Sequence, residues 1–156
     1  MSEPRFDSLA FDEIPRPHFA DVIVRPLPPG VTLDPAEWAD AIFSPEGAPR
    51  WVRAAFILRE ALVPLIGVPR GSPDTFTVAR VEGEEAVIVA PDTHLFFCCA
   101  VGVDPRRRLV RVTTTVRLHG WRGRLYFAPV KLVHPVVVQS MLRRASRTLH
   151  RRARAR

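Results

Sequence analysis

The chain of 156 residues is long enough to bury one hydrophobic core, and its composition, 47% hydrophobic and 25% charged, is that of an ordinary globular domain. Its net charge of +7 is unevenly distributed: all 16 acidic residues lie at or before Asp104, whereas residues 106–156 carry 15 basic residues and no acidic one. This asymmetry indicates either an acidic or phosphate-bearing partner for the C-terminal end, or contact of that end with the acidic half of the same domain.

The cysteines and the hydropathy pattern bear on location. Cys98 and Cys99 are adjacent in an apolar run, where neighbouring strand residues point to opposite faces, so we do not expect them to bridge each other. They are typical of small core residues in a reduced protein, and we predict a cytoplasmic localisation. No secretory signal is apparent, and no window of about 18 apolar residues predicts a transmembrane segment.

The N-terminal third predicts an arm, a strand and a short helix. Residues 1–17 are rich in proline and acidic side chains, so we expect a flexible N-terminal arm whose apolar residues could still dock on a surface. A first strand follows over Phe19–Leu27 and ends in the turn Pro28–Gly30. A short helix then begins after Asp34, a good N-cap residue, with Pro35 at its first position.

The middle of the chain changes from a helical period to a period of two. A second helix is predicted from about Arg50 to Ile66, because apolar residues recur there at helical spacing from Trp51 to Leu65. Four strands are then predicted at Thr75–Val81, Ala86–Ala90, His94–Val103 and Leu109–His119. In the last of these strands, the alternate residues Arg111, Thr113, Thr115 and Arg117 are expected to face solvent.

The longest predicted element is a helix over Gly120–Leu149, followed by a basic tail at residues 150–156. Its apolar stripe contains Tyr126, Val130, Val133, Val137 and Met141, and is widened by Phe127, Val138 and Leu142. Only the sheet can cover such a stripe. The element order therefore predicts an α+β fold, in which an antiparallel sheet wraps around a long C-terminal helix and two short helices follow the first strand.

Five segments carry a family resemblance: PLPPG (Pro26–Gly30), PRWVRAAFILREAL (Pro49–Leu62), DTHLFF (Asp92–Phe97), TTTVRLH (Thr113–His119) and GRLYFAPVKLVHPVVVQSMLRRA (Gly123–Ala145). The domain at residues 18–149 resembles the helix-grip proteins of the START-like (SRPBCC) superfamily, and more closely a bacterial family of unknown function within it. Members of this superfamily hold an apolar ligand between the sheet and the long helix. The chain departs from their usual six-strand meander, because only four strands follow the helices.

The resemblance implies binding of a small hydrophobic ligand, without catalysis, in a cavity between the sheet and the C-terminal helix. The residues expected to line that cavity are Phe56, Phe97, Val116, Tyr126, Val130, Val133 and Val137. Apolar and aromatic residues at this spacing are equally typical of an ordinary core.

Two alternatives remain open. Asp92 and His94 open one strand and His119 closes the next, so the three could act as general acid and base of a cyclase- or dehydratase-like enzyme; equally, Asp92 could cap a turn and His94 bind the backbone. Arginines at the C-terminal end could bind an anionic membrane or nucleic acid, or form a solvated charge run: Arg143, Arg144, Arg147, Arg151 and Arg152. The histidines lack metal-ligand spacing, so neither metal nor cofactor is expected.

Overall fold

The computed structural model describes residues 7–44, 48–67 and 76–155. The strands are β1 (Phe19–Pro26), β2 (Val78–Glu82), β3 (Glu85–Pro91), β4 (Leu95–Asp104) and β5 (Leu109–Leu118). The helices are α1 (Leu9–Glu13), α2 (Pro35–Phe43), α3 (Arg50–Leu62), the 3-10 turn η1 (Val63–Ile66) and α4 (Gly120–Arg154). The predicted α+β fold is confirmed, and the terminal helix is longer than predicted because it includes most of the basic tail.

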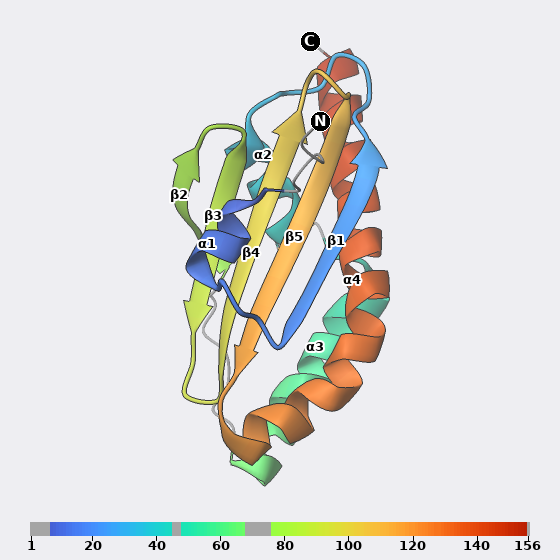
Figure 1. The fold of residues 1–156 in the computed structure, drawn as a ribbon. Coiled ribbons are helices and arrows are strands. Elements are labelled where there is room, and N and C mark those ends of the chain that lie inside the picture. The colour runs from blue at the N-terminus through green and yellow to red at the C-terminus, as the bar shows by residue number, and fades with distance from the viewer. Residues whose placement is uncertain (1–6, 45–47, 68–75, 156) are drawn as a thin grey trace.

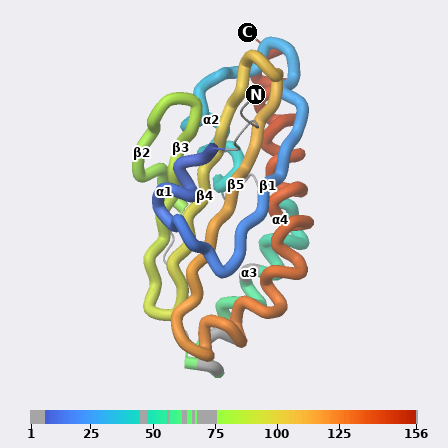
Figure 2. Tube along the Cα trace, in the orientation of Figure 1, coloured from blue at the N-terminus to red at the C-terminus, as the bar shows by residue number. Residues whose placement is uncertain are grey.

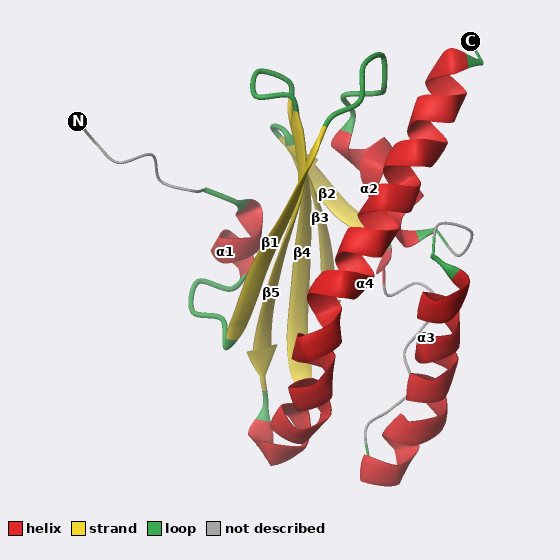
Figure 3. Ribbon diagram, turned by 90° about the vertical axis from the view of Figure 1, so that its right-hand side faces the viewer, coloured by secondary structure: helices red, strands yellow, loops and turns green. Residues whose placement is uncertain are grey.

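The five strands form one antiparallel sheet in the order β1-β5-β4-β3-β2, with α1 on one face and the other helices on the opposite face (Figures 1 and 3). The hairpin between β4 and β5 is closed by Asp104, whose Oδ1 accepts a 2.8 Å hydrogen bond from the amide of Arg107. That amide holds the pKa of the Asp104 carboxyl below its usual value. Because β5 pairs with both β4 and the N-terminal strand β1, a distant segment completes the meander.

The larger core lies between the sheet and helices α2 and α4. Asp34 caps α2 as predicted, its Oδ1 accepting from the amide of Ala36 at 2.8 Å, and the helix buries Trp38 and Ile42 completely. From α4, the buried residues are Gly123, Phe127, Val138, Met141, Leu142, Ala145 and Leu149. The predicted stripe is therefore correct in its second half and wrong at Val133, which is 54% exposed.

The buried side of α4 differs from the predicted stripe because of contacts with the edge strand β1. The ring of Phe19 contacts both Phe127 and His134 of α4, with ring centroids 5.1 and 5.5 Å apart. These contacts place the Phe127–His134 side of the helix, not the Val133 side, against the sheet. Pro129 and Pro135 lie inside α4, where each removes one backbone hydrogen bond without ending the helix.

The other face of the sheet is covered by the N-terminal segment, which crosses the sheet before β1 begins (Figure 2). We expected an arm without fixed structure, but residues 9–13 form α1, and Ala10 and Ile14 are fully buried against this face. The hydroxyl of Thr115 donates a 2.9 Å hydrogen bond to the carbonyl of Ala10. The prediction that Thr113 and Thr115 face solvent is therefore wrong, because both are buried on the face of the sheet that α1 covers.

The first turn of α4 meets the start of β4 at Gly123. A Cβ atom at this position would lie 2.2 Å from the backbone carbonyl oxygen of His94, closer than any normal contact. Only glycine allows the helix to start this close to the strand.

We expect Gly123→Ala to lower the free energy of unfolding by at least about 2 kcal/mol, because backbone must move to admit the methyl group. Urea denaturation followed by circular dichroism measures this change. The control is Leu125→Ala in the same turn, where the side chain is exposed and the change should stay below about 0.5 kcal/mol. Equal stabilities of the two variants would contradict the prediction.

Candidate functional site

The predicted acid/base residues lie together at one end of the sheet, where β4 begins and β5 ends. The amide of His119 donates to the carbonyl of His94 at 2.8 Å. Asp92 Oδ1 accepts from the amide of Thr93, and His94 Nε2 lies 3.1 Å from the carbonyl oxygen of Gly67. Both side chains thus bind backbone groups that shape the turn and the end of η1, and His119 is exposed.

The residues predicted to line a ligand cavity differ widely in how deeply they are buried. Val116 is buried, Val133 is more than half exposed, and the side chain of Phe56 lies outside the part of the chain that the structure describes. Phe97, Tyr126, Val130 and Val137 are half-buried. Tyr126 turns toward α3, where its hydroxyl accepts a 2.6 Å hydrogen bond from Arg59 Nε. These residues therefore belong to several environments and do not all converge on one point.

Phe97 belongs to an aromatic cluster on the helix-bearing face of the sheet. Its ring meets Phe76 edge-on at 6.0 Å, and Phe76 stacks on Phe43 of α2 at 5.4 Å. Phe76 keeps 36% of its surface exposed, and Phe97 is only partly buried. This cluster therefore keeps some aromatic surface accessible beside Phe97, one of the predicted cavity residues.

A buried pair that the sequence did not reveal joins α4 to β1. His134 Nδ1 lies 2.8 Å from Asp21 Oδ2, and about six-sevenths of each side chain is buried, at 14% and 15% exposure. Neither residue has a partner nearby in sequence, so only the tertiary fold brings them together. The pair anchors the N-terminal half of α4 to the sheet edge, beside the Phe19 contacts.

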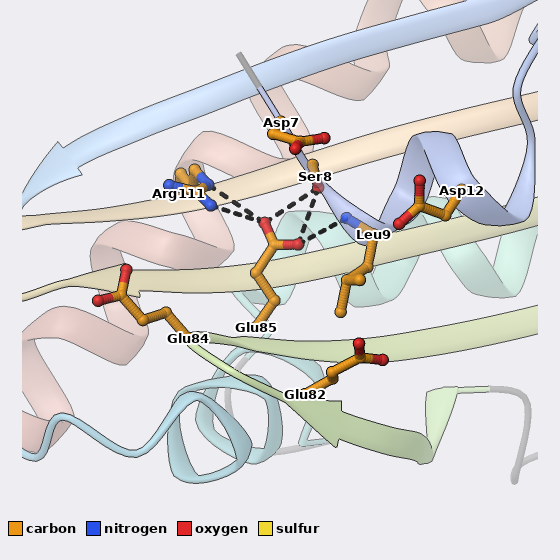
Figure 4. Close-up of a pocket in the computed structure, with 8 residues that line it drawn as sticks. All are labelled: Asp7, Ser8, Leu9, Asp12, Glu82, Glu84, Glu85 and Arg111. Atoms are coloured by element: carbon orange, nitrogen blue, oxygen red, sulfur yellow. Dashed lines mark hydrogen bonds and ion pairs between the residues drawn. The ribbon is translucent and has the colours of Figure 1, made fainter. Parts of the chain in front are cut away.

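The α1 face carries an acidic pocket of about 280 Å³, shown in Figure 4. Its centre is Glu85, whose carboxylate is buried and accepts from Ser8 Oγ at 3.0 Å, the Leu9 amide at 2.7 Å and Arg111 Nη2 at 2.9 Å. The remaining lining is mostly acidic: Asp7, Asp12, Glu82 and Glu84. Groups of the protein itself donate the hydrogen bonds that the buried Glu85 carboxylate accepts. We therefore interpret these contacts as structural, because they hold α1 on the sheet.

We expect Glu85→Ala to lower the free energy of unfolding by roughly 3 kcal/mol, because it leaves Arg111 without its buried carboxylate and α1 without its anchor. Urea denaturation is the measurement. Glu84→Ala, an exposed carboxylate in the same pocket, serves as the control and should change stability little. A similar loss in both variants would show that general charge, not the Glu85 network, is responsible.

The two cysteines are free and buried, and Cys98 faces α1 whereas Cys99 faces α4, as their adjacency predicted. Burial raises the pKa of the Cys98 thiol to about 12 and that of Cys99 further. Both are therefore protonated at neutral pH and are not nucleophiles.

Neither thiol of the native protein should react with Ellman's reagent at pH 7 to 8, because this range lies far below the raised pKa values. Both should react after unfolding in guanidinium chloride. Fast labelling of one thiol in the native state, shown by mass spectrometry of the labelled peptides, would overturn this assignment.

The side of α4 that points away from the sheet has its own pattern. Seven exposed residues follow one another at intervals of four and seven, which keeps them on one side of the helix: Trp121, Leu125, Leu132, Val136, Arg143, Arg147 and Arg154. We call these residues the outer face of α4. It is apolar in the first half of the helix and basic in the second, and Leu132 is 75% exposed.

Helix α3 adds further exposed apolar surface beside this face. In α3, Trp51, Ile57 and Leu58 are exposed, and Leu65 in the following turn η1 is 80% exposed. Among its described side chains only Val52 is buried. The hydrogen bond from Arg59 to Tyr126 holds α3 next to α4 (Figure 3).

The apolar character of α4 also corrects one expectation. Within the described residues, α4 is long and apolar enough to cross a membrane by length and composition, although no uninterrupted apolar window exists. Only 22% of its most apolar 18-residue window is buried inside the protein. Such a helix is weak support for a membrane span, because α4 also buries one face on the sheet.

The whole chain was compared with protein families, curated proteins and solved structures. Comparison with curated proteins and with solved structures finds no match. A family model described as "Protein of unknown function (DUF2867)" matches residues 14–141, which include all five strands and the first two-thirds of α4. The chain therefore belongs to the DUF2867 family.

Proposed function

We propose that the protein associates with anionic lipid surfaces through α3 and the outer face of α4. The observation that carries this proposal is the division of the outer face into an apolar half and a basic half. In a helix that lies in the plane of a bilayer interface, the apolar half of this face would enter the acyl boundary, and the arginines of the basic half would lie at the phosphates. The superfamily resemblance is compatible with a lipid-binding role and remains part of the proposal.

The positive charge of α3 and α4 favours an anionic lipid surface over a neutral one. Helix α4 contains nine basic residues and no acidic residue, and α3 adds three arginines and one glutamate. Each basic residue near an anionic bilayer contributes on the order of 1 kcal/mol of binding free energy, so several acting together give strong but salt-sensitive attraction. The acidic pocket lies on the opposite face of the sheet, where it would not be brought to the same surface.

Burial of apolar surface adds a contribution that salt does not screen. Trp121, Leu125, Leu132 and Val136 keep more than half of their surface in water. Full burial of one such side chain is worth roughly 1.5–3 kcal/mol. The two tryptophans at the surface, Trp51 and Trp121, are of the type enriched at membrane–water interfaces, and the guanidinium of Arg122 lies over the Trp121 ring at 5.5 Å.

We expect the protein to co-float with vesicles of phosphatidylcholine and phosphatidylglycerol, and not with phosphatidylcholine alone. The double variant Leu132→Glu/Val136→Glu should bind at least about tenfold more weakly, because two exposed apolar side chains that a bilayer would bury are replaced by negative charges. The matched control is Val24→Glu/Val81→Glu, which alters half-exposed valines on the edge strands β1 and β2.

Three results would count against membrane association. Equal vesicle binding by the two double variants would exclude the outer face of α4 as the membrane-binding surface. Binding of single-stranded DNA without binding of any vesicle would favour nucleic acid as the partner. The wild-type protein could instead fail to bind vesicles and form a dimer whose population rises with concentration. If Leu132→Glu/Val136→Glu abolished that dimer, the outer face of α4 would be a contact between copies of the chain.

A second candidate is binding of a small apolar molecule, favoured by the accessible aromatic cluster of Phe43, Phe76 and Phe97. This proposal places the ligand on the same side of the sheet as α4, where the superfamily resemblance implies it. Native mass spectrometry of the purified protein tests it, since a bound apolar molecule adds mass that Phe97→Ala should remove. The acid/base alternative gains no comparable support, because the hydrogen bonds of Asp92 and His94 go to backbone atoms.

A further inference from the structure

The two edges of the sheet differ in how well they are protected against pairing with a further strand. At the β2 edge, a register shift between Val78 and Arg80 interrupts the ladder, and Arg80 forms ion pairs with Glu13 and Glu82. Irregularities and charged side chains of this kind prevent edge-to-edge pairing. At the opposite edge, β1 pairs with β5 in unbroken register over eight residues.

The free hydrogen-bonding groups of β1 belong to every second residue. The amide of His119 donates to the carbonyl of His94, which places the odd-numbered residues of β5 against β4 and the even-numbered ones against β1. Because these even-numbered residues lie opposite odd-numbered residues of β1, the N–H and C=O groups of Ala20, Val22 and Val24 point away from the sheet. No backbone hydrogen bond from the described helices or loops reaches these groups.

The side chains of the same residues form an apolar strip along the free edge. Ala20, Val22, Val24 and Pro26 alternate with the residues that face α4, and all four are exposed. Val22 and Val24 keep 37% and 48% of their surface in water. A strand added at this edge would cover the strip with its own alternate side chains, which favours apolar residues at those positions.

The face of β1 that packs on α4 carries positive charge. Arg25 is half-buried there, and none of the ion pairs among the described residues includes it. Helix α4 contains no acidic residue, and its exposed Lys131 lies one turn before His134, which contacts Asp21 of β1. Figure 3 looks onto this edge and shows α1 and α4 on opposite sides of β1. A carboxylate beside Arg25 would therefore complete the charge pairing of this edge.

We propose that β1 is a docking edge for an extended segment of another protein, which adds to the sheet as a sixth strand antiparallel to β1. The segment carries apolar side chains where it hydrogen bonds to Ala20, Val22 and Val24, and a carboxylate at the next position, opposite Arg25. Backbone hydrogen bonds give such a site its affinity, and the alternate side chains give its specificity. This edge is separate from the outer face of α4, so the inference goes beyond the proposed membrane association.

The probe is a peptide of sequence VEVTVKV, capped at both ends. In antiparallel pairing its valines lie at the hydrogen-bonded positions, its glutamate opposite Arg25 and its lysine opposite Asp21. We expect calorimetric titration to give a Kd below about 1 mM. Hydrogen exchange followed by NMR should slow at the amides of Ala20, Val22 and Val24 when the peptide binds.

Methylation of single peptide nitrogens provides the matched control. A methyl group on the nitrogen of the second valine removes a hydrogen bond to β1 and should abolish binding. The same group on the threonine nitrogen, which points away from β1, should leave binding nearly unchanged.

A change of charge tests the stated chemistry of the partner. Arg25→Glu should weaken binding of VEVTVKV at least about fivefold, because an attractive cross-strand pair becomes a repulsive one. Replacing the glutamate of the peptide by lysine should restore binding to this variant and weaken binding to the wild type. Vesicle binding should not change in Arg25→Glu, because Arg25 lies outside α3 and the outer face of α4. Failure of the strand-docking edge and failure of membrane association are therefore seen in different assays.

The proposal is overturned if VEVTVKV does not bind at millimolar concentration, or if the two methylated peptides bind equally well. Slower exchange in β2, with none in β1, would move the docking site to the other edge. Protection of Ala20, Val22 and Val24 that rises with protein concentration in the absence of peptide would replace the proposed partner by a second copy of the chain.

Discussion

Burial of one side of α4 against the sheet is the constraint on which the rest of the structure depends. A helix of 35 residues cannot be stable in water on its own propensity with two internal prolines, so packing must hold it. The sheet supplies that packing through β5 and the edge strand β1, and Gly123 lets the first turn approach the start of β4. The same packing decides which side of the helix points outward, and so creates the outer face.

Two buried polar contacts determine how the outlying segments attach to this frame. The His134–Asp21 pair binds the N-terminal half of α4 to β1, and the Glu85 network binds α1 to the opposite face. Both are costly if broken, because a lone buried charge loses its water without gaining a partner. They therefore favour one arrangement of helices on each face, in addition to the less specific effect of apolar burial.

The fold also separates the charges that the sequence places at its two ends. Carboxylates gather around α1 and the β2–β3 hairpin, whereas the arginines follow α4 on the other side of the sheet. The described part of α4 runs as a helix to Arg154 and does not fold back onto Glu82, Glu84 or Glu85. Within the described residues, the basic end of α4 therefore does not reach the carboxylates of the β2–β3 hairpin.

Sequence periodicity determined the α+β class, the long terminal helix and the β-meander, because these depend on local spacing and turn residues such as Asp34 and Asp104. Three results needed the tertiary structure. Which side of α4 is buried depended on the Phe19 contacts, and the burial of Thr113 and Thr115 depended on the docking of α1. The pairing of His134 with Asp21 joins residues 113 positions apart in the chain, and spacing within a segment carries no information on such a contact.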